Sequence, residues 1–444
     1  LTFLRTMKTT RRNFLKSTSV ATIAAPFILP SHIWSAQVKP NDRINMGFIG
    51  MGKQNQHLLR HFMNLPGTQA VAVCDVDSSR RKDARQRVER HYADKNQAGT
   101  FSGCEDYIDY QKLLERDDID AVCIATPDHW HALMATDAAK AKKDIYCEKP
   151  LCQSIKEARR MVNAVRYNKR IFQTGSMQRS SEEFRVACEL VRNGIIGPIS
   201  RVEVSVGGPA KTCDLPEETM EPGLDWDRWL GPAPERAYNA ALSPRGVHNH
   251  YPAWRNYREY GGGGVTDWGA HHFDIAQWGL GMDNEGPRRI YPSKNPESGN
   301  GVRMVYQSGI EMLHTEGNGV TFFGKDGKVN VNRGRFNFWL GDKQIADNRK
   351  QCKQVAQEYL ADAKVRLYKS ADHKKDFLDC MRTRTRPIAD VEIGARTVTV
   401  CHLVNLSYYH NEPMHWNPFR EQFMNGKGQK EWLDVEHRAP YSFG

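Results

Sequence analysis

The chain has 444 residues, of which 39% are hydrophobic and 26% are charged, a composition typical of a folded globular protein. This length is too great for one ordinary core and suits two domains. The net charge of +11 would indicate nucleic-acid binding only if the basic residues were concentrated on one face or helix. Five basic residues and no acidic one precede residue 37, and the remaining basic residues are mixed with acidic ones. We therefore expect no nucleic-acid partner.

Residues 1–36 have the pattern of an export signal. Arg11 and Arg12 are followed by Phe14-Leu15 and by a mildly apolar stretch at 20–29, which resembles a bacterial twin-arginine signal and predicts a periplasmic protein. The alternative is a basic amphipathic tail with a chance arginine pair. The apolar stretch is shorter than the roughly 20 residues that a spanning helix needs, and no later segment approaches that length. We expect no integral membrane segment, although a retained signal would leave the protein associated with a membrane.

Residues 44–174 alternate between short apolar runs and helical spacing. Apolar strands separated by helices predict a parallel sheet that is covered on both faces. The start of one helix is marked by Ser154 and Glu157, which stand three residues apart, the spacing of a capping box. The expected strands are 44–49, 70–74, 121–125, 144–147 and 171–174, and the expected helices are 56–62, 81–92, 131–142 and 154–167.

The second half of the chain has a different pattern. A helix over 182–193 and a strand over 199–206 precede an excursion at 207–262, rich in Gly, Pro and Trp, of the kind that builds a site or a lid. Alternating segments between 288 and 338 predict antiparallel strands, and helices are expected over 372–382 and 393–408. The predicted fold class is α/β, with an N-terminal Rossmann doubly wound parallel sheet and a C-terminal α/β domain that has a large, mostly antiparallel open sheet.

A dinucleotide site is indicated by Gly50-Met51-Gly52, which lies between an expected strand and an expected helix. The first glycine permits the tight turn, and the second lets a pyrophosphate approach the backbone at the helix N-terminus. Asp75 ends the next strand, where an acidic residue binds the adenosine ribose and repels a 2′-phosphate. NAD is therefore favoured over NADP. NADP is the less favoured alternative, because Arg80 and Arg81 follow Asp75 closely. Asn55 departs from the motif, because its third position normally holds glycine or alanine.

Two segments carry residues suited to hydride transfer. Cys147-Glu148-Lys149-Pro150 ends a parallel strand, so its side chains emerge at the carboxyl edge of the sheet, where ligands bind. Asp267 and His271 are four residues apart, hence neighbours on one face of a helix. Oxidation of a secondary alcohol needs a base, which a neutral imidazole supplies, and a cation such as Lys149 to stabilise the alkoxide. The carboxylate would orient the imidazole or contact the same hydroxyl. The alternatives are that Asp267 is only a helix N-cap and Lys149 only a surface lysine.

With these segments the sequence resembles the glucose-fructose oxidoreductase / inositol dehydrogenase / rhizopine-catabolism (Gfo/Idh/MocA) family. The stretch Asp225-Trp226-Asp227 to Pro232 resembles exported members, and Asp128 departs from the asparagine that many members carry. The motifs that carry the resemblance are Gly50-Met51-Gly52, Ala125-Thr126-Pro127-Asp128-His129-Trp130-His131, Glu148-Lys149-Pro150-Leu151, the stretch from Gly263 to Asp274, and Arg386-Pro387-Ile388-Ala389-Asp390.

The resemblance implies roles for individual residues. Lys149 matches the catalytic lysine, and Asp267 and His271 match the Asp-x-x-x-His pair. Thr126, Pro127 and Glu148 match positions that line the nicotinamide half of the cofactor site. A homodimer or homotetramer is also implied, formed through the open face of the second sheet. The expected boundaries are then 1–36 for the export signal, 37–176 for the NAD-binding Rossmann domain and 177–444 for the catalytic and oligomerisation domain.

The expected function is NAD-dependent hydride transfer from a ring hydroxyl of a sugar, a sugar derivative or a cyclitol. Besides Lys149, Asp267 and His271, the candidate substrate-binding residues are Tyr251 and Arg255, of which Arg255 equally suits a structural ion pair. One alternative is a glycosidase that retains its NAD and works by an oxidation-elimination cycle, as some exported members of the family do. A second alternative is a non-catalytic sugar-binding protein.

A metal site is a further alternative. His248, His250, His271-His272 and Asp274 are residue types that bind zinc. They show no accepted metal-site spacing such as HExxH, and hydride transfer to a nicotinamide needs no metal. The sequence therefore predicts no metal site.

Overall fold

The computed structural model describes residues 43–95 and 103–443. The predicted export signal lies outside these residues. Within them, six strands form a parallel sheet in the order β3-β2-β1-β4-β5-β6, which is the doubly wound arrangement expected from the sequence. The strands are β1 (Ile44–Ile49), β2 (Thr68–Cys74), β3 (Glu105–Tyr107), β4 (Ala121–Ile124), β5 (Asp144–Cys147) and β6 (Phe172–Thr174).

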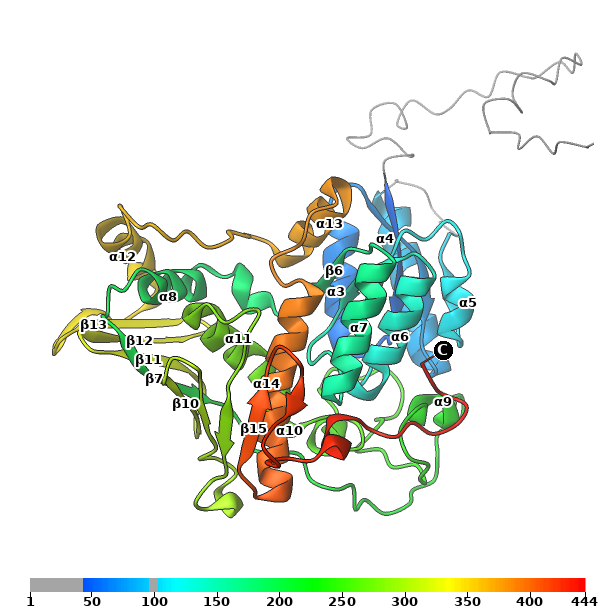
Figure 1. Cartoon of the computed structure of the whole chain (residues 1–444). Coiled ribbons are helices and arrows are strands. Elements are labelled where there is room, and N and C mark those ends of the chain that lie inside the picture. Colours follow the sequence, from blue (N-terminus) through cyan, green and yellow to red (C-terminus); the bar gives the residue numbers. More distant parts are fainter. Residues whose placement is uncertain (1–42, 96–102, 444) are drawn as a thin grey trace, which may run out of the picture. The chain divides into compact units, whose positions relative to one another are not determined.

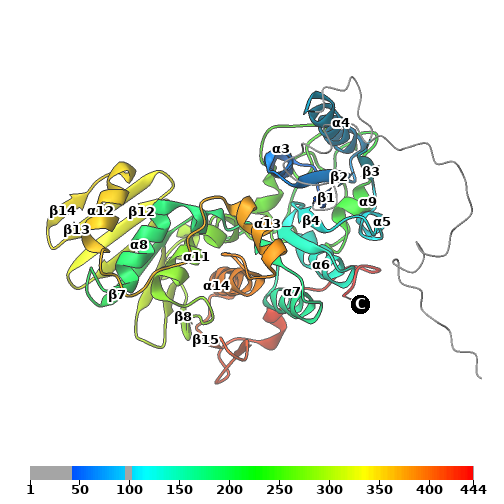
Figure 2. The same ribbon diagram turned by 90° about the horizontal axis from the view of Figure 1, so that it is seen from above.

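Helices cover both faces of this sheet, as Figure 2 shows. Apolar residues of α3 and α4 pack on one face, and those of α5, α6 and α7 pack on the other. The predicted capping box of α7 is confirmed, because the side chains of Ser154 and Glu157 each accept from the other's backbone N–H. These helices are α3 (Lys53–Asn64), α4 (Ser78–Lys95), α5 (Tyr110–Leu114), α6 (Asp128–Lys140) and α7 (Ile155–Tyr167).

Two helices from the end of the chain complete this coverage. Phe377 of α13 (His373–Thr383) lies edge-on to Phe62 and Tyr146, at ring distances of 6.4 and 5.9 Å. Val391 and Ala395 of α14 (Val391–His410) belong to the core on the opposite face. The first sheet is therefore buried partly by residues more than two hundred positions further along the chain.

The second sheet has ten strands within the described part of the chain, in the order β14-β13-β12-β11-β7-β10-β9-β8-β15-β16. Every neighbouring pair whose register is known is antiparallel except β7 and β10. The mostly antiparallel sheet predicted from the sequence is thus confirmed. Its strands are β7 (Ile199–Ser205), β8 (Arg289–Tyr291), β9 (Arg303–Val305), β10 (Glu311–Thr315), β11 (Gly319–Gly324), β12 (Gly327–Asn332), β13 (Arg335–Leu340), β14 (Lys343–Ala346), β15 (Met414–Asn417) and β16 (Gln422–Phe423).

Helices lie on one face of the second sheet (Figure 1), namely α8 (Glu182–Arg192), α11 (Gly269–Leu280), α12 (Cys352–Tyr359) and part of α14. Alternate strand residues such as Val202 and Phe322 are buried against them. The residues between them point to the other face and are partly exposed, with Leu313, Glu203 and Thr321 in one row across the sheet. Association of two copies through this open face stays a prediction.

The excursion after β7 returns to the carboxyl edge of the first sheet. It contains α9 (Trp226–Leu230) and leads into α10 (Gly263–Asp267). Leu224 forms a bridge with Asp77, and the backbone N–H of Ser78 donates to Gly223 at 2.9 Å. The excursion has its own small core of mostly aromatic side chains. Among the described residues, no helix is long and apolar enough to span a bilayer.

Candidate active site

The glycine turn after β1 fits a dinucleotide pyrophosphate. Gly50 has a φ of +81°, and a Cβ at this position would lie 2.7 Å from the Thr126 Cγ2 atom, so only glycine is accommodated. A Cβ at Gly52 would meet nothing within 4 Å, which leaves open space above the N-terminus of α3. Backbone N–H groups at a helix N-terminus attract phosphate oxygens. The turn thus has the shape that binding of NAD or NADP requires.

Asn55, the departure from the glycine motif, is fully buried between α3 and the sheet. Its amide donates to the Ile49 carbonyl oxygen at 3.0 Å, and the Cys123 thiol donates to its amide oxygen at 3.3 Å. In place of a small residue that allows close packing, the chain uses hydrogen bonds from α3 to β1 and β4.

Asp75 lies at the end of β2 with its carboxylate directed at the glycine turn. The backbone N–H groups of Met51 and Asp77 donate to its two oxygens at 2.6 and 2.8 Å. Burial raises the pKa of Asp75, and the nearby Arg80 guanidinium opposes this rise. The carboxylate is therefore held beside the turn, where an adenosine ribose would lie.

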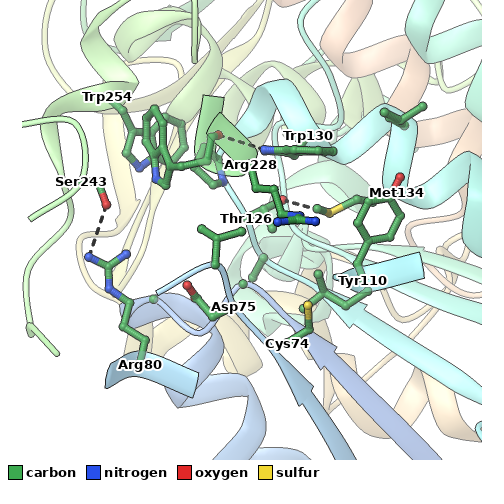
Figure 3. Close-up of a pocket in the computed structure, with 18 of the residues that line it drawn as sticks. Cys74, Asp75, Arg80, Tyr110, Thr126, Trp130, Met134, Arg228, Ser243 and Trp254 are labelled. Atoms are coloured by element: carbon green, nitrogen blue, oxygen red, sulfur yellow. Dashed lines mark hydrogen bonds between the residues drawn. The ribbon is translucent and has the colours of Figure 1, made fainter. Parts of the chain in front are cut away.

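Both arginines that follow Asp75 are bound to other parts of the protein. Arg80 donates through Nε to the Gly246 carbonyl oxygen at 3.0 Å and through Nη2 to the Ser243 hydroxyl at 3.4 Å (Figure 3). Arg81 donates to the Asp106 carboxylate at 2.9 Å and to the Asp75 carbonyl oxygen at 2.8 Å. Arg80 lines the first cavity, but both guanidinium groups already have hydrogen-bond partners within the protein.

Two adjoining cavities lie at this edge of the sheet. The first, of about 460 Å³, extends from the glycine turn across Asp75. The second, of about 870 Å³, contains the predicted catalytic residues. Gly50, Gly52, Asp75, Thr126, Pro127, Tyr251 and Arg255 line the first cavity, and Thr126, Glu148, Lys149, Tyr251, Arg255, Asp267 and His271 line the second. Of the catalytic, cofactor-binding and substrate-binding residues predicted from the sequence, Met51 alone lines neither cavity. Its side chain is buried, and its backbone N–H donates to Asp75.

Lys149 and Asp267 form the central contact of the second cavity. The Lys149 ammonium donates to the Asp267 carboxylate at 2.6 Å and to the Asp267 backbone carbonyl oxygen at 2.9 Å. This carbonyl oxygen is available because the helix predicted across this segment is divided: α10 ends at Asp267, and α11 begins at Gly269. The N–H of His271 bonds to the Trp268 carbonyl oxygen instead. The interruption of the helix thus creates a second acceptor for the lysine.

Burial and the nearby cations keep His271 neutral. Burial lowers the pKa of its imidazole well below the ordinary value, and the cations of Lys149 and Arg333 lower it further. Its Nδ1 atom is buried and has no hydrogen-bond partner among the described residues. Burial by itself would raise the pKa of the Asp267 carboxyl. The cations of Lys149 and Arg255 outweigh this effect, so the pKa of Asp267 lies below its ordinary value. A neutral base therefore stands beside an ionised carboxylate.

Two further carboxyl groups line the second cavity. The Gln54 amide donates to Glu148 at 2.9 Å, and burial raises the pKa of Glu148, against the effect of Lys149. Asp128, which is 4% exposed, begins α6. Burial raises its pKa to about 8, although Arg255 opposes this. At neutral pH most of Asp128 is thus protonated and has the hydrogen-bonding groups of an uncharged side chain, as the asparagine of related sequences would.

Tyr251 and Arg255 contact each other at the junction of the two cavities. The Arg255 guanidinium lies 5.1 Å from the Tyr251 ring, and its Nε is 3.8 Å from the Asp267 carboxylate. The Tyr251 hydroxyl donates to Gln54 at 3.2 Å. Arg255 thus lines both cavities and forms an ion pair with Asp267, and its part in substrate binding stays a prediction.

Sequence reasoning missed Arg333, which enters the second cavity from the turn between β12 and β13. Its guanidinium lies 4.8 Å from the Trp268 ring. The Gln178 side-chain amide has one orientation in which both its oxygen and its nitrogen form hydrogen bonds. In that orientation its oxygen accepts from Arg333 at 3.2 Å, and its nitrogen donates to the His271 carbonyl oxygen at 3.1 Å. Arg333 forms no ion pair with a described carboxylate. A hairpin turn so far along the chain gives no sequence signal that it reaches this site.

The helix that carries His271 is held by a buried ion pair. Arg179 lies in the short 3-10 helix η2 (Met177–Ser180) after β6 and is 1% exposed. It donates to both oxygens of Asp274 at 2.7 and 2.8 Å, and Thr397 of α14 donates to the same carboxylate at 2.9 Å. Three elements therefore meet at one carboxylate on α11.

The other residues considered for a metal have separate partners. Asp274 binds Arg179, and the His272 ring lies 2.7 Å from the Asn318 side-chain oxygen. His248 and His250 lie side by side with ring centroids 4.5 Å apart. Over residues 43–95 and 103–443, no group of three or more His, Cys, Asp or Glu side chains is placed to hold a metal ion.

Comparison with protein families gives two matches. The model described as an oxidoreductase family with an NAD-binding Rossmann fold matches residues 44–176. The model described as an oxidoreductase family C-terminal alpha/beta domain matches residues 209–443, more than half of the chain. A curated relative, a glycosyl hydrolase family 109 protein of Shewanella pealeana, is 31% identical over 218 residues. That match covers 45% of this chain and 46% of the relative, so the chain matches about half of the relative's length.

Solved structures share the fold at low identity. The WlbA dehydrogenase from Bordetella pertussis, in complex with NADH and UDP-GlcNAcA, has a TM-score of 0.58 and 16% identity, over 85% of this chain and 99% of its own. A 3-ketoreductase from Actinomadura kijaniata, in complex with NADP, has a TM-score of 0.52 and 18% identity, over 82% of this chain and 97% of its own. One fold thus accommodates either nicotinamide cofactor.

The raised pKa of Asp128 predicts a pH-dependent gain in stability for Asp128→Asn. Between its ordinary pKa near 4 and about 8, the folded protein holds a proton that the unfolded chain releases, so stability falls as the pH rises through this window. Asparagine removes this loss. We therefore compare the free energy of unfolding of the variant with that of the parent. We expect this difference to be larger in favour of the variant at about pH 8.5 than at about pH 4.5, by up to a few kcal/mol, because one pKa unit corresponds to about 1.4 kcal/mol.

Urea unfolding at the two pH values measures this difference. The control is Asp118→Asn, because Arg116 lowers the pKa of Asp118 and this variant should show no such gain. A stability difference between parent and Asp128→Asn that is the same at both pH values would contradict a raised pKa.

Proposed function

The chain belongs to the Gfo/Idh/MocA family of oxidoreductases, and we propose that it transfers a hydride from a ring hydroxyl of a sugar, a sugar derivative or a cyclitol to NAD. The observation that carries this proposal is the placement of Lys149, Asp267 and His271 together in a cavity that adjoins the glycine turn. A nicotinamide would reach this cavity from a pyrophosphate bound at Gly52.

The chemistry divides between two side chains. His271 is neutral and takes the proton of the substrate hydroxyl. The Lys149 ammonium binds the same oxygen and stabilises its developing negative charge. Asp267 fixes the lysine through two acceptors, so the ammonium is oriented before a substrate arrives. NAD, when bound, supplies the hydride acceptor.

The choice of NAD over NADP is proposed from the end of β2. A carboxylate beside the adenosine ribose repels a 2′-phosphate, and Arg80 and Arg81 are held by other groups. The buried Asp75 carboxylate beside the glycine turn, and the hydrogen bonds that already occupy Arg80 and Arg81, together favour a ribose without a 2′-phosphate.

Asp75→Ser should shift the preference toward NADP. The substitution removes the negative charge that repels the 2′-phosphate and leaves a hydroxyl that can accept from Met51. Fluorescence titration with NADH and NADPH gives the ratio of affinities, with Asp118→Ser as a surface control. If the ratio is the same in Asp75→Ser and in the parent, Asp75 does not select the cofactor.

Lys149→Ala and His271→Ala should lose activity in different ways. Loss of the alkoxide-stabilising cation is expected to lower turnover by about 10²–10³, as for an oxyanion donor. Loss of the base is expected to cost about 10²–10⁴, and only this variant should recover partly with rising pH or added imidazole. The measurement is turnover against pH for each variant on an accepted substrate. If His271→Ala keeps most of the parental turnover, Asp267 or Tyr251 is the next candidate base.

A second candidate function is glycoside cleavage with a retained cofactor. This function is favoured by the similarity to the glycosyl hydrolase family 109 protein, a match that extends over about half of that relative's length. Oxidation of a ring hydroxyl would acidify a neighbouring C–H, and loss of that proton would expel the aglycone and leave a double bond. Water would then add across this double bond, and return of the hydride from NADH would reduce the ketone to the hydroxyl. Lys149 and His271 would serve both activities.

A panel of sugars and glycosides separates these functions. With NAD-loaded protein, a net rise in nicotinamide absorbance indicates a dehydrogenase. Release of aglycone without net absorbance change indicates the glycosidase. Binding without either product would favour the sugar-binding alternative.

Export and self-association are proposals that rest on the sequence. Arg11-Arg12 and the apolar stretch at 20–29 support twin-arginine export to the periplasm. The open face of the second sheet, with Thr321 near its centre, supports a homodimer or homotetramer.

A further inference from the structure

The first cavity extends beyond Asp75 into a part that no predicted cofactor residue lines. This part lies between the ends of β2 and β3 and one side of α6. Since a ribose at Asp75 separates the pyrophosphate from the base, the remaining space is where an adenine would lie. The residues that line it include Ile108, Tyr110, Trp130, Met134, Arg228 and Tyr441.

Its walls suit a planar base. The rings of Tyr110 and Trp130 meet edge-on at 5.8 Å, and the Arg228 side chain points into the cavity that they line (Figure 3). Aromatic rings and guanidinium groups are the surfaces on which nucleic-acid bases stack. The Tyr110 hydroxyl donates to Asp137 at 2.7 Å, which leaves its ring as the contact surface.

The last residues of the chain close this end of the cavity. Pro440, Tyr441 and Ser442 line it, and the Tyr441 ring lies edge-on to Trp130 at 5.2 Å. On its other side Trp130 packs against Gly231, where a Cβ would collide with the indole, and its Nε1 donates to the Trp229 carbonyl oxygen at 3.0 Å. The excursion and the C-terminal segment thus hold Trp130 between them.

The C-terminal segment (red in Figure 1) is fixed by two side chains just before it reaches the cavity. Before it reaches the cavity, His437 lies 2.7 Å from the buried Glu157 of α7. Arg438 then donates to the Asp227 carboxylate at 2.6 Å and to the Gly231 carbonyl oxygen at 3.0 Å. These contacts place Tyr441 over the cavity without any ligand.

We propose that residues 440–442 and Arg228 form the adenine end of the dinucleotide site, so that bound NAD lies beneath the C-terminal segment and leaves when this segment lifts. The inference rests on the proposed function, because it assumes that this cavity binds NAD. It assigns to the end of the chain a part in cofactor retention, in addition to the glycine turn and Asp75.

Dissociation of NADH tests this proposal directly. Protein loaded with NADH is mixed with excess NAD, and the loss of nicotinamide fluorescence gives the dissociation rate. Tyr441→Ala removes the wall and Arg438→Ala removes the contacts with α9. Each should accelerate dissociation by about tenfold or more, the size expected when an aromatic contact with a base is lost. Tyr441→Phe should behave as the parent.

The control is Phe419→Ala, which removes a 62% exposed ring whose contact is with Arg288. Thermal unfolding verifies that each variant is folded, and Tyr441→Leu, which keeps apolar bulk, replaces Tyr441→Ala if that variant is not. If Tyr441→Ala and Arg438→Ala bind NADH and release it at the same rate as Phe419→Ala, this inference is overturned while the proposed function stands. If the parent does not bind NADH, the proposed function fails and this inference with it.

Discussion

The position of His271 depends on a guanidinium that is shielded from water. Arg179 is 1% exposed and binds Asp274 on the helix that carries His271, while Thr397 binds the same carboxylate from α14. Arg179 also binds Asp283, so removal of Arg179 would leave the buried Asp274 carboxylate without its cation, a loss of the kind that costs about 3–5 kcal/mol. Since Arg179 follows β6 directly, the pair fixes α11 against the edge of the first sheet, where Lys149 also emerges.

The charges of the site follow from this placement. Asp267 is the ionised carboxylate at the centre, and Lys149 and Arg255 approach it from two segments. The excess of cations, together with burial, keeps His271 unprotonated and Asp267 charged. An alkoxide on a substrate would meet a positive environment, and the base that formed it would be neutral beforehand. In the proposed reaction, one arrangement of charges would therefore serve both proton removal and alkoxide stabilisation.

The parts of this protein that sequence reasoning predicted are those in which local pattern and position agree. Apolar strands between helices predicted the first sheet, and the residues after β1, β2, β4 and β5 fall at its carboxyl edge because parallel strands end together. The division of the helix at Trp268, the hairpin residue Arg333 and the C-terminal wall at Tyr441 were not predicted. Each depends on contacts between segments far apart in the chain, which leave no local spacing to read.

The two proposed activities differ in how the cofactor is exchanged rather than in the groups that handle the proton. A dehydrogenase must release NADH after each oxidation, whereas an oxidation-elimination cycle returns the hydride to the same sugar and needs the cofactor to stay. Lys149 and His271 act identically in both. The residues that govern release lie at the other end of the dinucleotide, where Tyr441 closes on Trp130. If the proposed wall, whose Arg438 binds Asp227, slows exchange, the site suits the activity that keeps its NAD; if NADH leaves readily, the site suits the dehydrogenase. Under the two proposals, the choice between these reaction types would be made at the adenine end, far from the reacting carbon.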